Sequence, residues 1–183
     1  MSGFADTHAH LHDEAFSNDL EKVLDRARES KIDFIVDVGT NIDESRAAVQ
    51  LAEKYPDIYA VVGVHPHYAK NWTHNFSDQL IELATNDYVV GIGEIGLDFF
   101  RNLSTADTQQ KVFIQQLEIA NSTGLPVVIH SRNAHEETYN ILASWVPMTS
   151  YDGPVGVIHC FSGDANLARR YTELGFIVSF AGP

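Results

Sequence analysis

Short apolar runs alternate with longer amphipathic stretches along the whole chain. The stretches between the apolar runs place hydrophobic residues three and four positions apart, which predicts helices. Several apolar runs are hydrophobic at successive positions, as expected for parallel strands that are covered on both faces. The runs predicted to be strands are Gly3–His8, Asp33–Val38, Ile58–Val64, Tyr88–Glu94, Val127–His130, Val155–His159 and Phe176–Phe180.

This regular alternation indicates right-handed βαβ units and a parallel sheet. The sequence shows no Pro/Ser-rich linker and no internal repeat, so residues 1–183 are treated as a single domain. The number of predicted strands fits a doubly wound open sheet, and it fits equally an eight-stranded barrel that lacks one strand. The hydrophobic pattern alone does not choose between these two folds.

The composition describes an acidic protein of ordinary globular character. Lys and Arg number 12 against 25 Asp and Glu, which gives a net charge of −13. This balance excludes a broad basic surface that coats duplex DNA, but it allows a small site where metal ions supply the positive charge. Cys160 is the single cysteine and is expected to pack against a helix. Without a disulfide, a signal peptide or a membrane-length apolar run, we expect a cytoplasmic protein with no membrane partner and no stable protein partner.

Histidine and glutamate side chains gather at the carboxyl ends of the predicted strands. His8 and His10 follow the first strand, Glu94 ends the fourth, His130 the fifth and His159 the sixth. Parallel sheets and barrels place their sites at this edge, and residues two apart on a strand project to the same side. A buried glutamate in an apolar strand is costly without a cation or another partner. The five residues therefore predict a site for a divalent metal such as Zn²⁺, Mn²⁺ or Mg²⁺.

Other motifs have a structural explanation beside the functional one. His65 and His67 either contact the substrate or belong to a polar turn that contains Pro66. Arg132 pairs either with a phosphate or with Glu136, four residues further along a predicted helix.

A glycine-rich motif at residues 91–96 matches the G-x-G-x-x-G pattern of dinucleotide-binding folds. In those folds the motif occupies the turn between a strand and a helix. Here its first glycines lie inside an apolar strand, so close packing of the backbone is the better explanation.

Five segments occur in an order and spacing typical of one known family. They are Asp6–Leu11, Gly63–His67, Gly93–Asp98, Pro126–Arg132 and His159–Gly163. Together they resemble the TatD-type deoxyribonucleases, which are amidohydrolase-like metal-dependent hydrolases. The resemblance implies an α/β fold of the (β/α)8 TIM-barrel type. Residues 1–183 would supply about seven of its eight strands, because the family's eighth strand, with an aspartate that binds metal, has no counterpart before Pro183.

The resemblance also implies one or two divalent metal ions (Mg, Mn or Zn) and a metal-activated water that hydrolyses the phosphodiester bonds of DNA. Such enzymes often act as 3′→5′ exonucleases, so single-stranded DNA ends are the expected substrate. The implied metal ligands are His8 and His10 for the first ion, His130 and His159 for the second, and Glu94 as the bridge between them.

In this reading Glu94 and His65 are the catalytic residues, and His65 and Arg132 contact the substrate. Two other functions stay open. The same metal site can polarise a carbonyl group, which would make the protein an amide or ester deacylase. A truncated and inactive chain that only binds metal is the second alternative.

Overall fold

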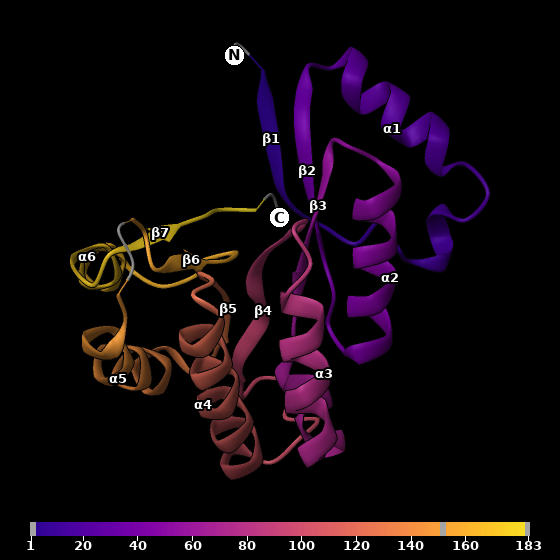
Figure 1. Ribbon diagram of the computed structural model, residues 1–183. Helices are drawn as coiled ribbons and strands as arrows, with labels where there is room; N and C mark the ends of the chain where they lie inside the picture. The colour runs from indigo at the N-terminus through magenta and orange to yellow at the C-terminus, as the bar shows by residue number, and fades with distance from the viewer. Residues whose placement is uncertain (1–2, 151–152, 182–183) are drawn as a thin grey trace.

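One parallel sheet carries seven strands in chain order in the computed structural model, which describes residues 3–150 and 153–181. Every pair of neighbouring strands is parallel. The sheet curls into a partial barrel with helices on its outer side (Figure 1), which confirms the predicted TIM-barrel type of fold. The strands are Phe4–Ala9 (β1), Ile32–Val38 (β2), Ile58–Val62 (β3), Val89–Asp98 (β4), Val127–Arg132 (β5), Gly156–Ile158 (β6) and Phe176–Val178 (β7).

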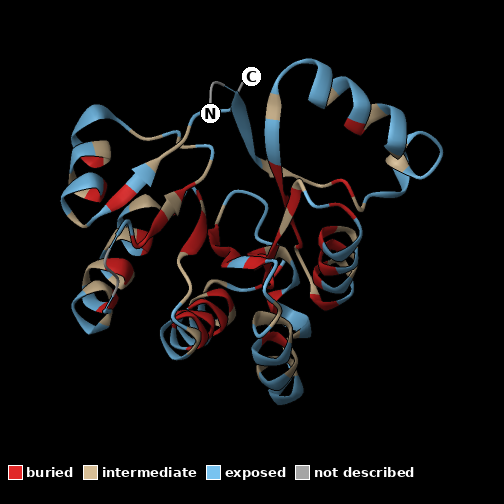
Figure 2. Cartoon of the chain, turned by 45° about the horizontal axis from the view of Figure 1, so that its top comes forward, coloured by how far each residue is buried: buried red, intermediate tan, exposed pale blue. Residues whose placement is uncertain are grey.

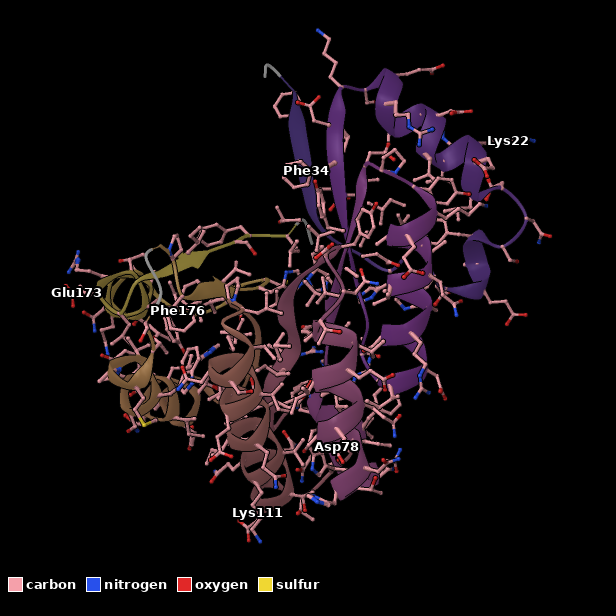
Figure 3. The ribbon with its side chains drawn as sticks, viewed as in Figure 1. Lys22, Phe34, Asp78, Lys111, Glu173 and Phe176 are labelled. Atoms are coloured by element: carbon pink, nitrogen blue, oxygen red, sulfur yellow. The ribbon has the colours of Figure 1, made fainter. Side chains whose placement is uncertain are left out.

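Six α-helices connect these strands within the described residues. Their charged faces point away from the sheet, as Lys22, Lys111 and Glu173 show in Figure 3. Among the described residues no helix has the length and apolar character that a membrane crossing requires. The helices are Leu20–Glu29 (α1), Ile42–Lys54 (α2), His74–Ala84 (α3), Ala106–Thr123 (α4), His135–Trp145 (α5) and Ala165–Glu173 (α6), and short 3-10 helices cover Glu14–Phe16 (η1), Pro66–Asn71 (η2) and Val146–Met148 (η3).

The two faces of the sheet have different packing. The outer face carries large side chains such as Ile58, Ile92 and Ile129, which belong to the main core beneath the helices. The inner face carries a smaller cluster of valines that includes Val61 and Val128. Figure 2 shows the buried residues along the strands and on the helix faces that cover them. Inner-face residues near the ends of the strands therefore line the mouth of the partial barrel.

β4 extends further than the sequence predicted. The apolar run suggested a strand that ends at Glu94, whereas the strand continues to Asp98. The alternation of inner and outer residues is also broken within it. Ile92 and Ile95 are three positions apart, yet both pack in the main core under the helices. A regular strand would turn residues three apart to opposite faces, so one extra residue is accommodated between them.

The register with β5 identifies this extra residue as a bulge. Ile92 lies opposite Val127 and Ile95 lies opposite Ile129, so three steps along β4 match two along β5. Gly93 permits the distortion, since a Cβ atom there would lie 2.7 Å from the Cβ of Val128. The bulge is what brings the next side chain, Glu94, to the inner face. A Cβ atom at Gly96 would likewise overlap the carbonyl oxygen of His130, so the predicted use of these glycines in close backbone packing is confirmed.

Candidate metal centre

Glu94 is the centre of a cluster of histidines at the mouth of the partial barrel. Only 5% of its surface is exposed. Its Oε1 accepts a hydrogen bond from Nδ1 of His130 at 2.9 Å and lies 4.0 Å from Nε2 of His65, while its Oε2 lies 3.5 Å from Nε2 of His8. Two sets of donor atoms, His8–Glu94–His159 and His65–Glu94–His130, each lie within 4.8 Å of one another. The carboxylate belongs to both sets, as a ligand that bridges two cations would.

Glu94 and His130 each favour the charged form of the other. Burial by itself raises the pKa of Glu94, but hydrogen bonds from His130 and His8 outweigh it and hold that pKa well below its usual range. Burial lowers the pKa of His130, and hydrogen bonds to Glu94 and Asp98 reverse this and raise it. Both ring nitrogens of His130 donate to carboxylates. A cation held between His130 and Glu94 would therefore replace the proton on Nδ1.

His8 and His159 form the second part of the cluster. Their rings are stacked with centroids 3.5 Å apart. Burial, together with the neighbouring His8, lowers the pKa of His159 to about 4, so His159 is a neutral imidazole at pH 7. Nδ1 of His8 is buried and has no hydrogen-bond partner among the described residues. The neutral imidazole of His159 and the ring of His8, beside an ionised carboxylate, form a donor set that fits a divalent cation.

His10 has the ring orientation of a ligand but lies outside both sets of donor atoms. Its Nδ1 donates a hydrogen bond to the carbonyl oxygen of Val38 at 2.7 Å. The lone pair of Nε2 is therefore free, as in many histidines that bind metal through one nitrogen and donate through the other. The centroid of its ring lies 5.1 Å from that of His8.

His65 has the opposite orientation. Its Nδ1 accepts the backbone N–H of His67 at 3.2 Å and so caps η2. Burial lowers the pKa of His65 to about 3, which leaves the ring neutral with its proton on Nε2. Nε2 is the atom that faces Glu94. This tautomer makes His65 a hydrogen-bond donor at the cluster rather than a ready ligand.

Asp98 is a site residue that the sequence analysis missed. Its Oδ2 accepts hydrogen bonds from Nε2 of His67 at 2.8 Å and from Nε2 of His130 at 3.2 Å. Burial raises the pKa of Asp98, but the backbone N–H of Arg101 and the two histidines lower it below its usual range. The signal was available in the sequence, because Asp98 follows Glu94 by four positions and such residues share a face on a strand.

Asp37 was also missed, and it supports the turn that follows His10. Its carboxylate is fully buried and accepts the backbone N–H of Leu11 at 2.6 Å and Nδ1 of His12 at 3.0 Å. Nε2 of His12 lies 3.6 Å from Glu44. An aspartate close to the end of the apolar run of β2 was the available signal, since a buried carboxylate needs partners.

The structure rejects one of the two alternatives for Arg132, and the expectation for Cys160 was wrong. Arg132 does not pair with Glu136, because that carboxylate binds Arg170 at 2.6 and 3.0 Å. The guanidinium of Arg132 lies instead over the ring of Phe100, with Cζ 4.0 Å from the centroid. Cys160 is exposed rather than packed against a helix, because it lies in the turn beyond the end of β6, with φ of 46°.

Nearly the whole chain matches one protein family. The family described as TatD related DNase matches residues 5–183. The chain belongs to the TatD family. The uncharacterized metal-dependent hydrolase YabD of Bacillus subtilis is 38% identical over 178 residues, which cover 97% of this chain and 68% of YabD. The 3′-5′ ssDNA/RNA exonuclease TatD of Pantoea ananatis is 40% identical over 168 residues, which cover 91% of this chain and 63% of the exonuclease.

Solved structures of the TatD family have the same fold. The crystal structure of YjjV, a TatD homolog from Escherichia coli, superposes with a TM-score of 0.87 at 33% identity and is matched over 96% of this chain and 66% of YjjV. A TatD-family hydrolase from Entamoeba histolytica superposes with a TM-score of 0.86 at 24% identity and matches 97% of this chain and 64% of its own. This TatD-family chain therefore spans about two thirds of the length of its relatives.

Proposed function

We propose that Glu94 and the histidines around it form the metal centre of a nuclease. This nuclease would hydrolyse the phosphodiester bonds of DNA at single-stranded ends. The observation that carries the proposal is the buried Glu94 carboxylate shared by two sets of histidines. A relative named 3′-5′ ssDNA/RNA exonuclease supports the class of substrate. When bound, one or two divalent ions (Mg, Mn or Zn) supply the charge that polarises a phosphoryl oxygen and lowers the pKa of a water molecule.

The chain offers ligands of two kinds. His8 and His159, with one oxygen of Glu94, would hold one ion, and the free Nε2 of His10 lies beside them. His130 and the other oxygen of Glu94 would hold the second. Compared with the assignment implied by the family motifs, this grouping pairs His159 with His8 rather than with His130.

The remaining residues position the substrate and the ligands. His65 presents an N–H at Nε2, which suits donation to a phosphoryl oxygen or to the leaving oxygen. Asp98 fixes the ring of His130 from the side opposite Glu94, as an outer carboxylate does for a metal-binding histidine. Arg132 brings a positive charge to the same mouth for a substrate phosphate.

The test is hydrolysis of oligonucleotides labelled at the 3′ or the 5′ end, single-stranded or duplex, by the purified protein. We expect mononucleotide release from single-stranded 3′ ends with Mg²⁺, Mn²⁺ or Zn²⁺ and none with EDTA. Release of product from acyl esters but not from DNA would indicate the deacylase instead. Metal binding by calorimetry without turnover on either substrate would indicate an inactive chain. Cell fractionation tests the proposed cytoplasmic location.

A further inference from the structure

Phe100 and Arg132 form an exposed aromatic–cation pair at the mouth of the partial barrel. The guanidinium carbon of Arg132 lies 4.0 Å from the centroid of the Phe100 ring. The phenylalanine nevertheless remains 58% exposed. An exposed aromatic ring beside a positive charge is the kind of platform on which the bases of single-stranded nucleic acids stack. The guanidinium keeps the ring in place while much of its surface stays available.

The backbone around Phe100 is fixed by hydrogen bonds on both sides. The N–H of Phe99 donates to the carbonyl oxygen of Arg132 at 2.9 Å, and the N–H of Arg101 donates to Oδ1 of Asp98 at 2.8 Å. Asp98 and Arg132 are also partners in the ladder between β4 and β5. The ring is thus presented by an ordered segment, which reduces the entropy that a ligand would lose on binding.

The pair adjoins the proposed metal centre directly. Arg132 follows His130 by two positions on β5, so both side chains project to the inner face about 6.6 Å apart along the strand. Asp98 bonds to His130 with one carboxylate oxygen and to the segment that carries Phe100 with the other. A molecule whose reacting group lies at Glu94 would therefore pass over the Phe100 ring.

The guanidinium of Arg132 favours an anionic and aromatic ligand here, although the chain as a whole is acidic. The chain has a net charge of −13, and several of its arginines are neutralised by carboxylates, such as Arg28 by Asp57 and Arg170 by Glu136. Within the described residues no ion pair or hydrogen bond is formed by the guanidinium of Arg132, so its N–H donors are available for a phosphate. Nucleotides combine a phosphate with a flat base that stacks on aromatic rings.

We propose that Phe100 is the residue on which the base of a single-stranded nucleic acid stacks next to the scissile phosphate, with Arg132 bound to the adjoining phosphate. This inference rests on the proposed nuclease function and specifies how the substrate is held. Stacking is tolerant of sequence, because every base has an aromatic face. The subsite therefore recognises the presence of a base rather than its identity.

The test uses equilibrium binding and kinetics of the purified protein with two oligonucleotides that differ only in whether the terminal nucleotides carry bases or are abasic. We expect Phe100→Ala to weaken binding of the normal strand about tenfold, measured by fluorescence anisotropy in EDTA, and to leave the abasic strand unchanged. With metal present, KM for the normal strand should rise by a similar factor while kcat stays the same, because the contact is made equally in the ground and transition states.

Phe100→Trp should restore the preference for the normal strand, and Leu103→Ala, which alters another exposed apolar residue of the same loop, should not change it. Equal binding of both strands by the parent protein, or an equal loss for both in Phe100→Ala, would overturn the stacking role even if hydrolysis proceeds normally. Base-dependent binding that disappears in Phe100→Ala, in a protein without hydrolysis, would support the subsite and reject the nuclease.

Discussion

At the scale of single residues, Glu94 is the side chain on which the proposed chemistry depends most. Glu94→Gln keeps the shape of the side chain but removes the charge that both sets of histidines face. We expect at least a hundredfold loss of kcat on single-stranded DNA, roughly 2.7 kcal/mol in the barrier, with the fold retained as judged by circular dichroism. Activity within about threefold of the parent, a difference of ~0.7 kcal/mol, would exclude a bridging role.

His65 and His67 offer a second comparison at this scale. His65 is buried with its N–H directed at the centre, whereas His67 is bonded to Asp98 and does not belong to either set of donor atoms within the described residues. We expect His65→Ala to lower kcat about tenfold or more, and His67→Ala to have a clearly smaller effect. Steady-state kinetics on the same oligonucleotide check this order, and the reverse order would reassign the donor role to His67.

At the scale of secondary structure elements, α1 is tied to the segment before β3 by one well-formed ion pair. Nε and Nη2 of Arg28 donate to the two carboxylate oxygens of Asp57 at 2.7 and 3.1 Å. The bond from Arg28 outweighs partial burial and lowers the pKa of Asp57. A carboxyl whose pKa is lower in the folded state stabilises the fold above its unfolded pKa, and this contribution disappears as the pH falls through the folded value.

Asp57→Asn should therefore lower the free energy of unfolding at pH 7 by about 0.5–1 kcal/mol, a modest amount because the pair is partly exposed to solvent. The difference between parent and variant should shrink as the pH falls below about 4. Urea unfolding across this pH range measures it. Asp25→Asn is the matched control, since Asp25 also bonds to Arg28 but is 68% exposed. A control effect as large as that of Asp57→Asn would contradict the assignment.

The sequence predicted the strands well where the hydrophobic pattern was regular, and it failed where that pattern was interrupted. Every strand run was confirmed because Val- and Ile-rich segments under helices are hydrophobic in a regular way. The prediction ended β4 at Glu94, where a charged residue interrupts the apolar run, whereas the strand continues to Asp98. Asp98 was missed because it lies beyond that predicted end. Arg132 was given a wrong alternative partner because the distance between α5 and α6, which lets Arg170 reach Glu136, is not visible in a local pattern.

At the scale of the whole molecule, the sheet has two edge strands. In the described residues β1 pairs with β2 alone and β7 with β6 alone. Phe4 on β1 is 69% exposed and Ile177 on β7 is 55% exposed. Unpaired edges with exposed apolar side chains favour association between chains.

We expect residues 1–183, expressed by themselves, to sediment as dimers or larger species at micromolar concentration. The double substitution Phe4→Lys and Ile177→Lys should shift this distribution towards monomer, because a charge on an edge strand opposes pairing between chains. Met148→Lys is the control, since Met148 is 63% exposed but lies outside both edge strands. Sedimentation velocity measures the distribution, and a monomeric parent protein would contradict the prediction.

The bulge in β4 makes the centre more sensitive to the length of this segment than to its composition. Loss of the single codon for Gly93 would leave two steps between Ile92 and Ile95, the number that β5 already takes between Val127 and Ile129. The rest of the strand would keep its pairing. Glu94, however, would then occupy the position where only a glycine fits against Val128. A one-codon deletion should therefore displace the central carboxylate and crowd the packing against Val128, so that the centre and part of the stability of the sheet are lost together.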